Sequence, residues 1–372
     1  MRIETIAVHA GSEPDPTTGA VAPPIHLSTT FEHGPAGEHT HGYLYIRESN
    51  PTQTRLETAL AALEGGEAAL AFASGMGAGT AILASLEPGS HVVLPDDVYV
   101  DFRNLARIFL AKWQIEHTIV NMSSLGLLQA AIRPNTRLVW LETPSNPLMK
   151  IVDIAGAVKM AHAAGAMVLV DNTFATPVLQ RPLELGADVS LYSTTKYFGG
   201  HSDVQGGALV FRKKDAFVEK VAEARRVLGA AASPFNSWLV LRGLRSLVCR
   251  MEKHSANGMA VALELSRLPS VSVVHYPGLA SHPGHDVAKK QMRGFGGMLS
   301  IRLKAGREQA IRVAARVRLF LTATSLGGVE SLIEHRASSE GPGTTTPEDL
   351  LRLSVGLEHP DDLIADLEQA LG

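Results

Sequence analysis

Cysteine is almost absent from this chain: its 372 residues include one, Cys249. A single cysteine excludes an internal disulfide framework and is typical of a reducing cytoplasm. Because Cys249 lies in a helix-like segment, we expect it to be a small buried hydrophobic side chain. The N-terminus lacks the long apolar core of a signal peptide, and no segment approaches the roughly 18 uninterrupted apolar residues of a membrane span. The sequence therefore favours a cytoplasmic protein without membrane contact.

An excess of charge of either sign is also missing. The 34 lysines and arginines are scattered and slightly outnumbered by 37 aspartates and glutamates, which disfavours nucleic-acid binding. Of the 15 histidines, His39 and His41 form the closest pair, without further ligands at metal spacing around them, so we expect loop side chains and no metal site. The length suffices for two domains and a large core.

Hydrophobic periodicity divides the chain into three parts. Residues 1–50 show no helical period and predict an extended N-terminal arm. Residues 51–235 alternate continuous apolar strands with helices, which predicts a mostly parallel sheet covered by helices on both faces. Residues 236–372 predict a smaller C-terminal α/β domain. The expected strands are 68–72, 91–94, 137–141, 166–170, 189–192, 208–211, 271–275, 298–303 and 351–355; the main expected helices are 55–63, 76–86, 236–268, 308–321 and 361–371.

The most informative segment surrounds Lys196. This lysine follows an apolar run and stands among small hydroxyl side chains, while an earlier apolar run ends in Asp171. A pyridoxal phosphate enzyme needs this combination, because the lysine forms a Schiff base with the aldehyde and the aspartate pairs with the pyridinium nitrogen. The hydroxyls of Ser193 and Thr195 can bind the phosphate. The alternative, a solvated surface lysine, is disfavoured by the preceding apolar strand and the following pair of glycines.

A second candidate site is the segment Ser74-Gly75-Met76-Gly77, which follows a strand and opens a helix. Free backbone N–H groups and the positive end of the helix dipole make such a position an anion site. The same segment, with Asp96 or Asp97 about 20 residues further on, mimics a dinucleotide fingerprint. The third glycine of that fingerprint is missing, because position 80 is threonine. A nicotinamide oxidoreductase would also leave Lys196 and Asp171 unexplained.

Several motifs resemble, in order from about residue 5 to the C-terminus, the Cys/Met-metabolism family of pyridoxal phosphate enzymes. That family includes cystathionine γ-synthase, cystathionine γ-lyase, methionine γ-lyase and the homoserine-ester sulfhydrylases. The motifs lie at residues 45–47, 50–52, 74–76, 142–147, 196–204, 233–235, 238–239, 242–244, 325–332 and 352–358. The resemblance implies a fold type I pyridoxal phosphate-dependent transferase.

The resemblance also implies roles for individual residues. Lys196 and Tyr99 are the implied catalytic residues, with Tyr99 stacked on the cofactor ring and its phenol close to the leaving group. Tyr45 and Arg47 would reach the phosphate of a neighbouring subunit, so that a dimer, or a dimer of dimers, is expected. The implied cofactor-binding residues are Tyr45, Arg47, Gly75, Met76, Tyr99, Asn146, Asp171, Ser193, Thr195 and Lys196; the implied substrate-binding residues are Arg352, Ser325, Thr324 and Asn146.

Each of these assignments has a plainer alternative. Tyr99 can be a packed aromatic residue at a helix start, and Asn146 a turn residue. Tyr45 and Arg47 can be a solvated loop pair. Arg352, whose planar guanidinium suits an α-carboxylate, can be an edge-strand residue that faces water. A non-catalytic protein that binds the cofactor is the remaining alternative, although every expected catalytic position is occupied.

The distal substrate pocket departs from each subfamily. Asp101 stands where methionine γ-lyases carry a cysteine. Asn104 replaces an arginine of several cystathionine enzymes, for which Arg103 can substitute. Thr324 stands where cystathionine enzymes often place a glutamate. The expected reaction is γ-replacement or γ-elimination of cystathionine γ-synthase or γ-lyase type; sulfhydrylase, methionine γ-lyase and a lyase for another leaving group remain alternatives.

Overall fold

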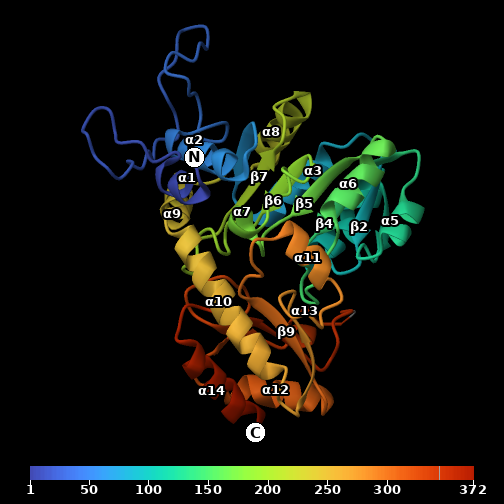
Figure 1. Cartoon of the computed structure of the whole chain (residues 1–372). Coiled ribbons are helices and arrows are strands. Elements are labelled where there is room, and N and C mark those ends of the chain that lie inside the picture. Colours follow the sequence, from blue (N-terminus) through green and yellow to red (C-terminus); the bar gives the residue numbers. More distant parts are fainter. Residues whose placement is uncertain (343) are drawn as a thin grey trace.

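Two sheets organise the chain in the computed structural model, which describes residues 1–342 and 344–372. Figure 1 shows the larger sheet in the upper half and the smaller sheet in the lower half, with the long helix α10 (Leu247–Leu265) running down from one to the other. This arrangement confirms the expected fold class, with a mostly parallel central sheet and a second, smaller α/β unit.

The larger sheet has seven strands in the order β1-β7-β6-β5-β4-β2-β3. β7 is antiparallel to both of its neighbours, and the remaining neighbours are parallel. The expected strands are found within a few residues, and one strand, β3, was not expected. Their bounds are β1 Ala68–Phe72, β2 His91–Pro95, β3 Glu116–Val120, β4 Thr136–Glu142, β5 Met167–Asp171, β6 Val189–Tyr192 and β7 Gly207–Phe211.

Helices cover both faces of this sheet because successive side chains of each strand point to opposite faces. In β4, Leu138 and Trp140 enter the core beneath α3 and α8, whereas Val139 and Leu141 enter the core beneath α5 and α6. The helices of this part of the chain are α2 Pro51–Glu64, α3 Gly75–Ala84, α4 Val100–Leu105, η1 Ala106–Leu110, η2 Ala111–Trp113, α5 Leu125–Ala131, α6 Ile154–Ala163, α7 Thr176–Leu179 and α8 Ala216–Leu228.

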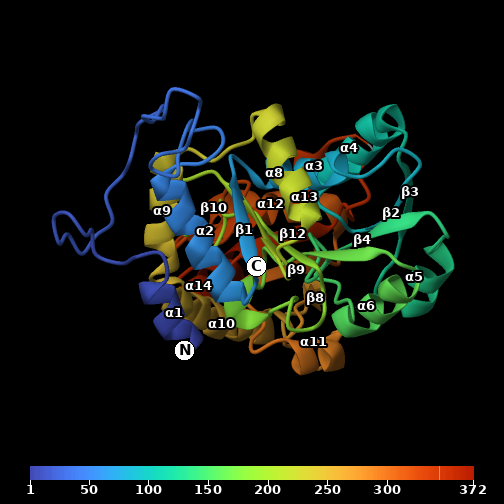
Figure 2. The same ribbon diagram turned by 90° about the horizontal axis from the view of Figure 1, so that it is seen from above.

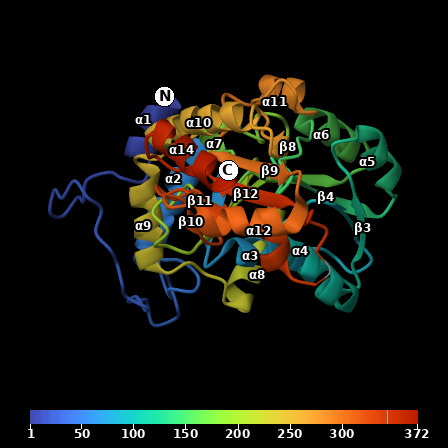
Figure 3. The ribbon, with the colours of Figure 1, turned by 90° about the horizontal axis from the view of Figure 1, so that it is seen from below.

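The smaller sheet has the strand order β10-β11-β12-β9-β8. Figure 3 shows α12 and α14 on the outer side of this sheet, where they form an apolar core with α10. The opposite face carries polar residues: Arg352 is in register with Glu334 and Ser300, and the Ser300 hydroxyl donates to the Pro147 carbonyl of the larger unit at 2.7 Å. The elements are α9 Pro234–Leu244, β8 Val271–His275, α11 His285–Gln291, β9 Met298–Leu303, α12 Gly306–Arg316, β10 Leu321–Thr322, β11 Leu332–Glu334, α13 Arg336–Glu340, β12 Leu350–Ser354 and α14 Pro360–Leu371.

The long helix expected over residues 236–268 is wrong, because α9 and α10 are separate helices. The buried guanidinium of Arg250 donates to the carbonyl of Gly243 at 2.8 Å and to the carbonyl of Tyr197 at 2.7 Å. The Gly243 carbonyl, near the end of α9, thus bonds to a side chain of α10 as well as to the backbone N–H of Ser246. The segment that carries Lys196 is fixed by the same arginine.

Three further expectations need correction. The helix expected to reach residue 321 ends at Arg316, because the carboxylate of Asp366 accepts the backbone N–H groups of residues 318, 319 and 320. The arm contains a short helix, α1 Ile3–His9, that packs against α2; the rest of the arm loops away from the body of the chain (Figure 2). Cys249 is exposed, since it lies on the outer side of α10 and not in the core.

Two features are absent from the described residues. None of their helices combines the length and the apolar character required to cross a bilayer. Within the same residues, no group of three or more histidine, cysteine, aspartate or glutamate side chains is arranged to hold a metal ion.

Candidate active site

One cavity lies where the carboxyl ends of the parallel strands meet the polar face of the smaller sheet. Its volume is about 470 Å³. Parallel α/β sheets place ligands at this edge because the loops after the strands converge there. The expected residues that line it are Gly75, Met76, Tyr99, Asn146, Asp171, Ser193, Thr195, Lys196, Thr324, Ser325 and Arg352.

Lys196 lies in the turn that follows β6, and its side chain enters this cavity. Its Nζ donates to the Ser325 Oγ at 2.7 Å, which joins the two parts of the chain across the cavity. Burial, and then the positive charge of Arg352, lower the pKa of Lys196 to about 8. The amine is therefore far closer to its neutral, nucleophilic form near pH 8 than an ordinary lysine. The solvated-lysine alternative is wrong.

Two carboxyl groups face each other on neighbouring strands: Asp171 ends β5 and is in register with Glu142 at the end of β4. Burial raises the pKa of Asp171 to about 6. Burial and the charge of Asp171 hold the pKa of Glu142 well above its usual range. Neither carboxylate forms an ion pair with any residue that the structure describes. A ligand that brings positive charge to Asp171 would therefore stabilise its ionised form.

The N-terminus of α3 offers backbone N–H groups to an anion. The Ser74 hydroxyl caps this helix by accepting from the N–H of Gly77 at 3.0 Å, which leaves the N–H groups of Gly75 and Met76 at the cavity wall. The Ser193 hydroxyl lies beside them without a partner among the described side chains. Thr195 also lines the cavity, but its hydroxyl already donates to the Gly206 carbonyl at 3.1 Å.

Tyr99 and Asn146 are both positioned by Glu142. The backbone N–H of Tyr99 donates to one carboxylate oxygen at 2.9 Å, and that of Asn146 to the other at 3.1 Å. The Tyr99 phenol donates to the Asp101 carboxylate at 3.1 Å. Burial, and then the charge of Asp101, raises the pKa of Tyr99, so the phenol keeps its proton. Both residues are thus parts of the cavity wall.

Arg352 is buried, with 4% of its surface exposed, in β12 between two other strands. The alternative of an edge-strand arginine facing water is therefore wrong. Its guanidinium donates to the Asn146 Oδ1 at 3.0 Å, to the Ser325 carbonyl at 2.9 Å and to the Glu334 carboxylate at 2.5 Å. Burial lowers its pKa to about 10, which leaves it cationic at neutral pH.

Tyr45 and Arg47 are the expected site residues that this cavity does not include. Tyr45 is 40% exposed in the arm, and the Arg47 guanidinium lies over its ring, 5.0 Å from the centroid. Their contact with a neighbouring subunit stays a prediction. Arg103 does not line the cavity either, whereas Asn104 does. His39 and His41 are exposed loop residues.

Sequence reasoning missed one wall of the cavity. Arg336, Ser339 and Glu340 of α13 line it, and Glu334 of β11 lies behind them. The signal was weak, because β11 has three residues and α13 has five. Glu142 stood within a recognised motif, yet its role became visible only when the strand register placed it beside Asp171.

The cavity as a whole fits pyridoxal phosphate. The α3 N-terminus and the Ser193 hydroxyl suit a phosphate, the unpaired carboxylate of Asp171 suits a protonated ring nitrogen, and the weakly basic Lys196 suits the aldehyde. Nothing comparable suits a dinucleotide, whose fingerprint lacks its third glycine.

Comparisons with known proteins agree with this geometry. The family model described as Cys/Met metabolism PLP-dependent enzyme matches residues 4–372. The chain is 52% identical to cystathionine gamma-synthase of Mycobacterium tuberculosis, covering 99% of this chain and 96% of that protein. It is 42% identical to cystathionine gamma-lyase of Bacillus subtilis, covering 100% and 99%. The crystal structure of metB from Corynebacterium glutamicum superposes with a TM-score of 0.97 at 44% identity, covering 100% and 98%.

Proposed function

Because the chain belongs to the Cys/Met metabolism family of PLP-dependent enzymes, we propose that the cavity around Lys196 is its active site and that it acts on γ-substituted amino acids. The chain is a PLP-dependent enzyme of the transsulfuration type. The observation that supports this site is the buried Lys196 amine, which donates to the Ser325 Oγ at 2.7 Å in a cavity that Asp171 and Arg352 also line.

The cofactor would be held by residues of the larger unit. Gly75, Met76 and Ser193 would bind the phosphate, and Asp171 would keep a proton on the ring nitrogen. When bound, the cofactor withdraws electrons from the substrate Cα and thereby weakens its bond to hydrogen. The phenol ring of Tyr99 would lie against the cofactor ring, where an offset contact contributes roughly 0.5–1.5 kcal/mol beyond burial.

The substrate would be oriented by its α-carboxylate. Arg352 can grip a carboxylate with two parallel N–H groups, and the Ser325 hydroxyl lies beside it at the amine of Lys196. With a pKa of about 8, Lys196 can accept a proton from Cα and return it at neighbouring carbons. The protonated phenol of Tyr99 can donate a proton to the departing γ-substituent.

The preferred reaction is γ-replacement by a thiol, as in a cystathionine γ-synthase, because a relative that carries this name is 52% identical. γ-Elimination to ammonia and a 2-oxo acid is the second candidate, since a γ-lyase relative is 42% identical. Asp101, which bonds to Tyr99, argues against the methionine γ-lyase alternative, because the thiol of that subfamily is replaced by a carboxylate.

Assembly and location belong to the same proposal. The exposed Tyr45 and Arg47 would complete a neighbouring subunit's phosphate site, so the smallest active unit would be a dimer and the full assembly a dimer of dimers. The single, exposed Cys249 suits the reducing cytoplasm.

A product assay with the purified holoenzyme tests this function. O-Succinyl- and O-acetyl-L-homoserine are each supplied with cysteine, with sulfide or with neither, alongside cystathionine and methionine. We expect cysteine-dependent formation of cystathionine from at least one ester, with less 2-oxo acid when cysteine is present. A fully loaded enzyme that forms neither thioether nor 2-oxo acid from any of these amino acids would overturn the proposal.

A further inference from the structure

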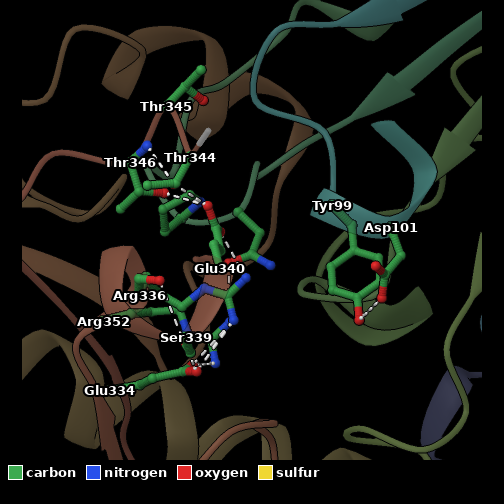
Figure 4. Close-up of polar contacts among 12 residues, drawn as sticks. Tyr99, Asp101, Glu334, Arg336, Ser339, Glu340, Thr344, Thr345, Thr346 and Arg352 are labelled. Carbon is green, nitrogen blue, oxygen red and sulfur yellow. Dashed lines mark hydrogen bonds and ion pairs between the residues drawn. The ribbon is translucent and has the colours of Figure 1, made fainter. Parts of the chain in front are cut away.

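A cluster of alternating charges forms the wall of the cavity that the smaller unit contributes (Figure 4). Glu334 pairs with Arg352 at 2.5 Å and with Arg336 at 3.3 Å, and Arg336 pairs with Glu340 at 2.8 Å. Figure 4 shows this cluster on one side and Tyr99 with Asp101 on the other. The substrate's γ-substituent would lie between these two sides.

Arg336 has donors that no described residue uses. Only 6% of the residue is exposed, and its Nε is buried without a hydrogen-bond partner. Its Nη1 is shared at 3.3 Å between both oxygens of Glu334, which is a long contact for a charged pair. A buried donor left unpaired costs about 1–3 kcal/mol. A ligand oxygen in the cavity could bond to this guanidinium through the weakly paired Nη1.

Glu340, by contrast, accepts hydrogen bonds at both of its carboxylate oxygens. Its carboxylate accepts from the Arg336 Nη2 at 2.8 Å, from the Thr344 hydroxyl at 2.5 Å and from the Thr346 hydroxyl at 3.0 Å. Arg103 lies 4.0 Å away on the outer side. Glu340 therefore holds Arg336 in place. The unused hydrogen-bonding groups of this wall are donors of Arg336, so the wall suits a ligand with acceptor oxygens and not a cation.

The charges of the cluster are nearly balanced. Three arginines, Arg103, Arg336 and Arg352, surround two glutamates, Glu334 and Glu340, so one positive charge remains after pairing. The substrate's α-carboxylate at Arg352 would match this remaining charge. A second carboxylate at Arg336 would therefore be held by charge-assisted hydrogen bonds and not by a further excess charge.

Arg336 and Arg352 line the same cavity as Tyr99 and Lys196. The charge of Arg336 lowers the pKa of Tyr99 more than the charge of Arg352 does. At Lys196 the order is reversed, and Arg352 has the larger influence. Arg336 therefore acts more strongly on the phenol that is proposed to serve the leaving group.

We propose that Arg336 is a specificity-determining residue that binds a carboxylate at the far end of the substrate's γ-substituent, and that Glu340 orients it. This inference rests on the proposed function, because it assumes a γ-substituted amino acid bound through Arg352. Suitable substituents are a dicarboxylic acid ester or a thioether that ends in an amino acid. A short neutral acyl group would leave the weakly paired Nη1 of Arg336 without a carboxylate partner.

Two pairs of compounds test the proposal. The kcat/KM values for O-succinyl- and O-acetyl-L-homoserine compare a carboxylate-ended substituent with a neutral one. Competitive inhibition by L-2-aminoadipate and L-norleucine compares the same ending without any γ-leaving group, and so measures binding alone. Both are measured with the holoenzyme of the wild type, of Arg336→Lys, of Arg336→Met and of the double variant R336M/E340M, which removes the buried pair together. Arg307→Met, which removes an exposed ion pair with Glu348 outside the cavity, is the control.

We expect Arg336→Met and the double variant to lower the succinyl-to-acetyl ratio of kcat/KM by about ten- to a hundredfold, the range expected for a charged hydrogen bond. The inhibition constant of L-2-aminoadipate should rise by a similar factor, while that of L-norleucine changes little. Arg336→Lys should recover part of the preference, and Arg307→Met should leave it unchanged. Equal losses on both esters, or an unchanged ratio in every folded variant, would overturn the assignment. Absence of turnover by the wild type would instead refute the proposed function.

Discussion

At the scale of single residues, burial moves the acids and the base of the cavity in opposite directions. The pKa of Lys196 falls to about 8, whereas those of Asp171 and Glu142 rise. Desolvation disfavours the charged form of each group, so the opposite signs follow from one cause. Positive charge at Arg352 adds to the effect on the lysine. A site built in this way has a weakly basic amine beside a carboxylate that lacks a cation.

The first prediction concerns the amine of Lys196 in the cofactor-free protein. Because its pKa is lowered to about 8, the neutral form should predominate above that pH and be lost below it. Labelling by an amine-reactive reagent, read by mass spectrometry of the Lys196 peptide, should rise to half its maximum near pH 8. Arg352→Met removes a positive charge and one of the two arginine partners of Glu334, so it should move the midpoint upward. A wild-type midpoint near 10, the range of an ordinary lysine, would contradict the assigned environment.

The second prediction concerns Arg352. Lysine keeps the positive charge but cannot offer two parallel N–H groups to a carboxylate. Arg352→Lys should therefore lower kcat/KM by roughly ten- to a hundredfold for every amino acid substrate, whatever its γ-substituent. Arg302→Lys, in the neighbouring strand and paired with Asp349, is the matched control. A loss confined to one substrate would mean that Arg352 does not bind the α-carboxylate.

At the scale of elements, apolar strands could be predicted because their side chains are buried on both faces, and this pattern is continuous in the sequence. The breaks of the helices could not be predicted from the sequence, because side chains of other helices cause them. Asp366 of α14 ends α12, and Arg250 binds the carbonyl that ends α9. The positions of Lys196, Asp171 and Arg352 could be inferred from motifs. The wall that α13 forms could not be inferred, since its charges become meaningful only when β11 brings them to the cavity.

The third prediction tests the close approach of β7 to the N-terminus of α3. A Cβ at Gly207 would lie 2.6 Å from the backbone N of Gly75, in a place where no flexible side chain can move aside. Gly207→Ala should displace the N–H groups proposed to bind phosphate and weaken cofactor binding at least about tenfold, with a loss of stability of about 1–3 kcal/mol. Spectroscopic titration of the cofactor and thermal unfolding measure both effects.

Gly126→Ala is the control for this substitution. Its Cβ would meet nothing closer than the Ser124 Oγ at 3.9 Å, within helix α5. Alanine should be neutral there or stabilise the helix by about 0.5–1 kcal/mol. If Gly207→Ala binds the cofactor as tightly as Gly126→Ala, the α3 N-terminus is not the phosphate site.

At the scale of the whole molecule, the arm is the part whose role is least fixed by its own contacts. Apart from α1, it loops away from the body of the chain, and Tyr45 remains 40% exposed (Figures 1 and 2). A segment with so little burial gains order most readily from a second subunit. The sequence motif around Arg47 predicts this role.

The fourth prediction is therefore subunit complementation. Arg47→Ala and Lys196→Ala should each be inactive, because one lacks a phosphate contact and the other the amine. Mixed under conditions of proven subunit exchange, they should regain part of the activity, since one of the two hybrid sites holds both intact residues. Mixtures that exchange subunits and yet stay inactive would show that Arg47 does not act on a neighbour's site.

The central claim is that Lys196 carries the cofactor in this cavity, and one measurement tests it most directly. The purified holoenzyme is reduced with borohydride, which fixes the cofactor to its lysine, and the modified peptide is located by mass spectrometry. The account predicts one modified lysine, Lys196, and the loss of the modification in Lys196→Ala. A reduced cofactor on any other lysine, or on none, would contradict it.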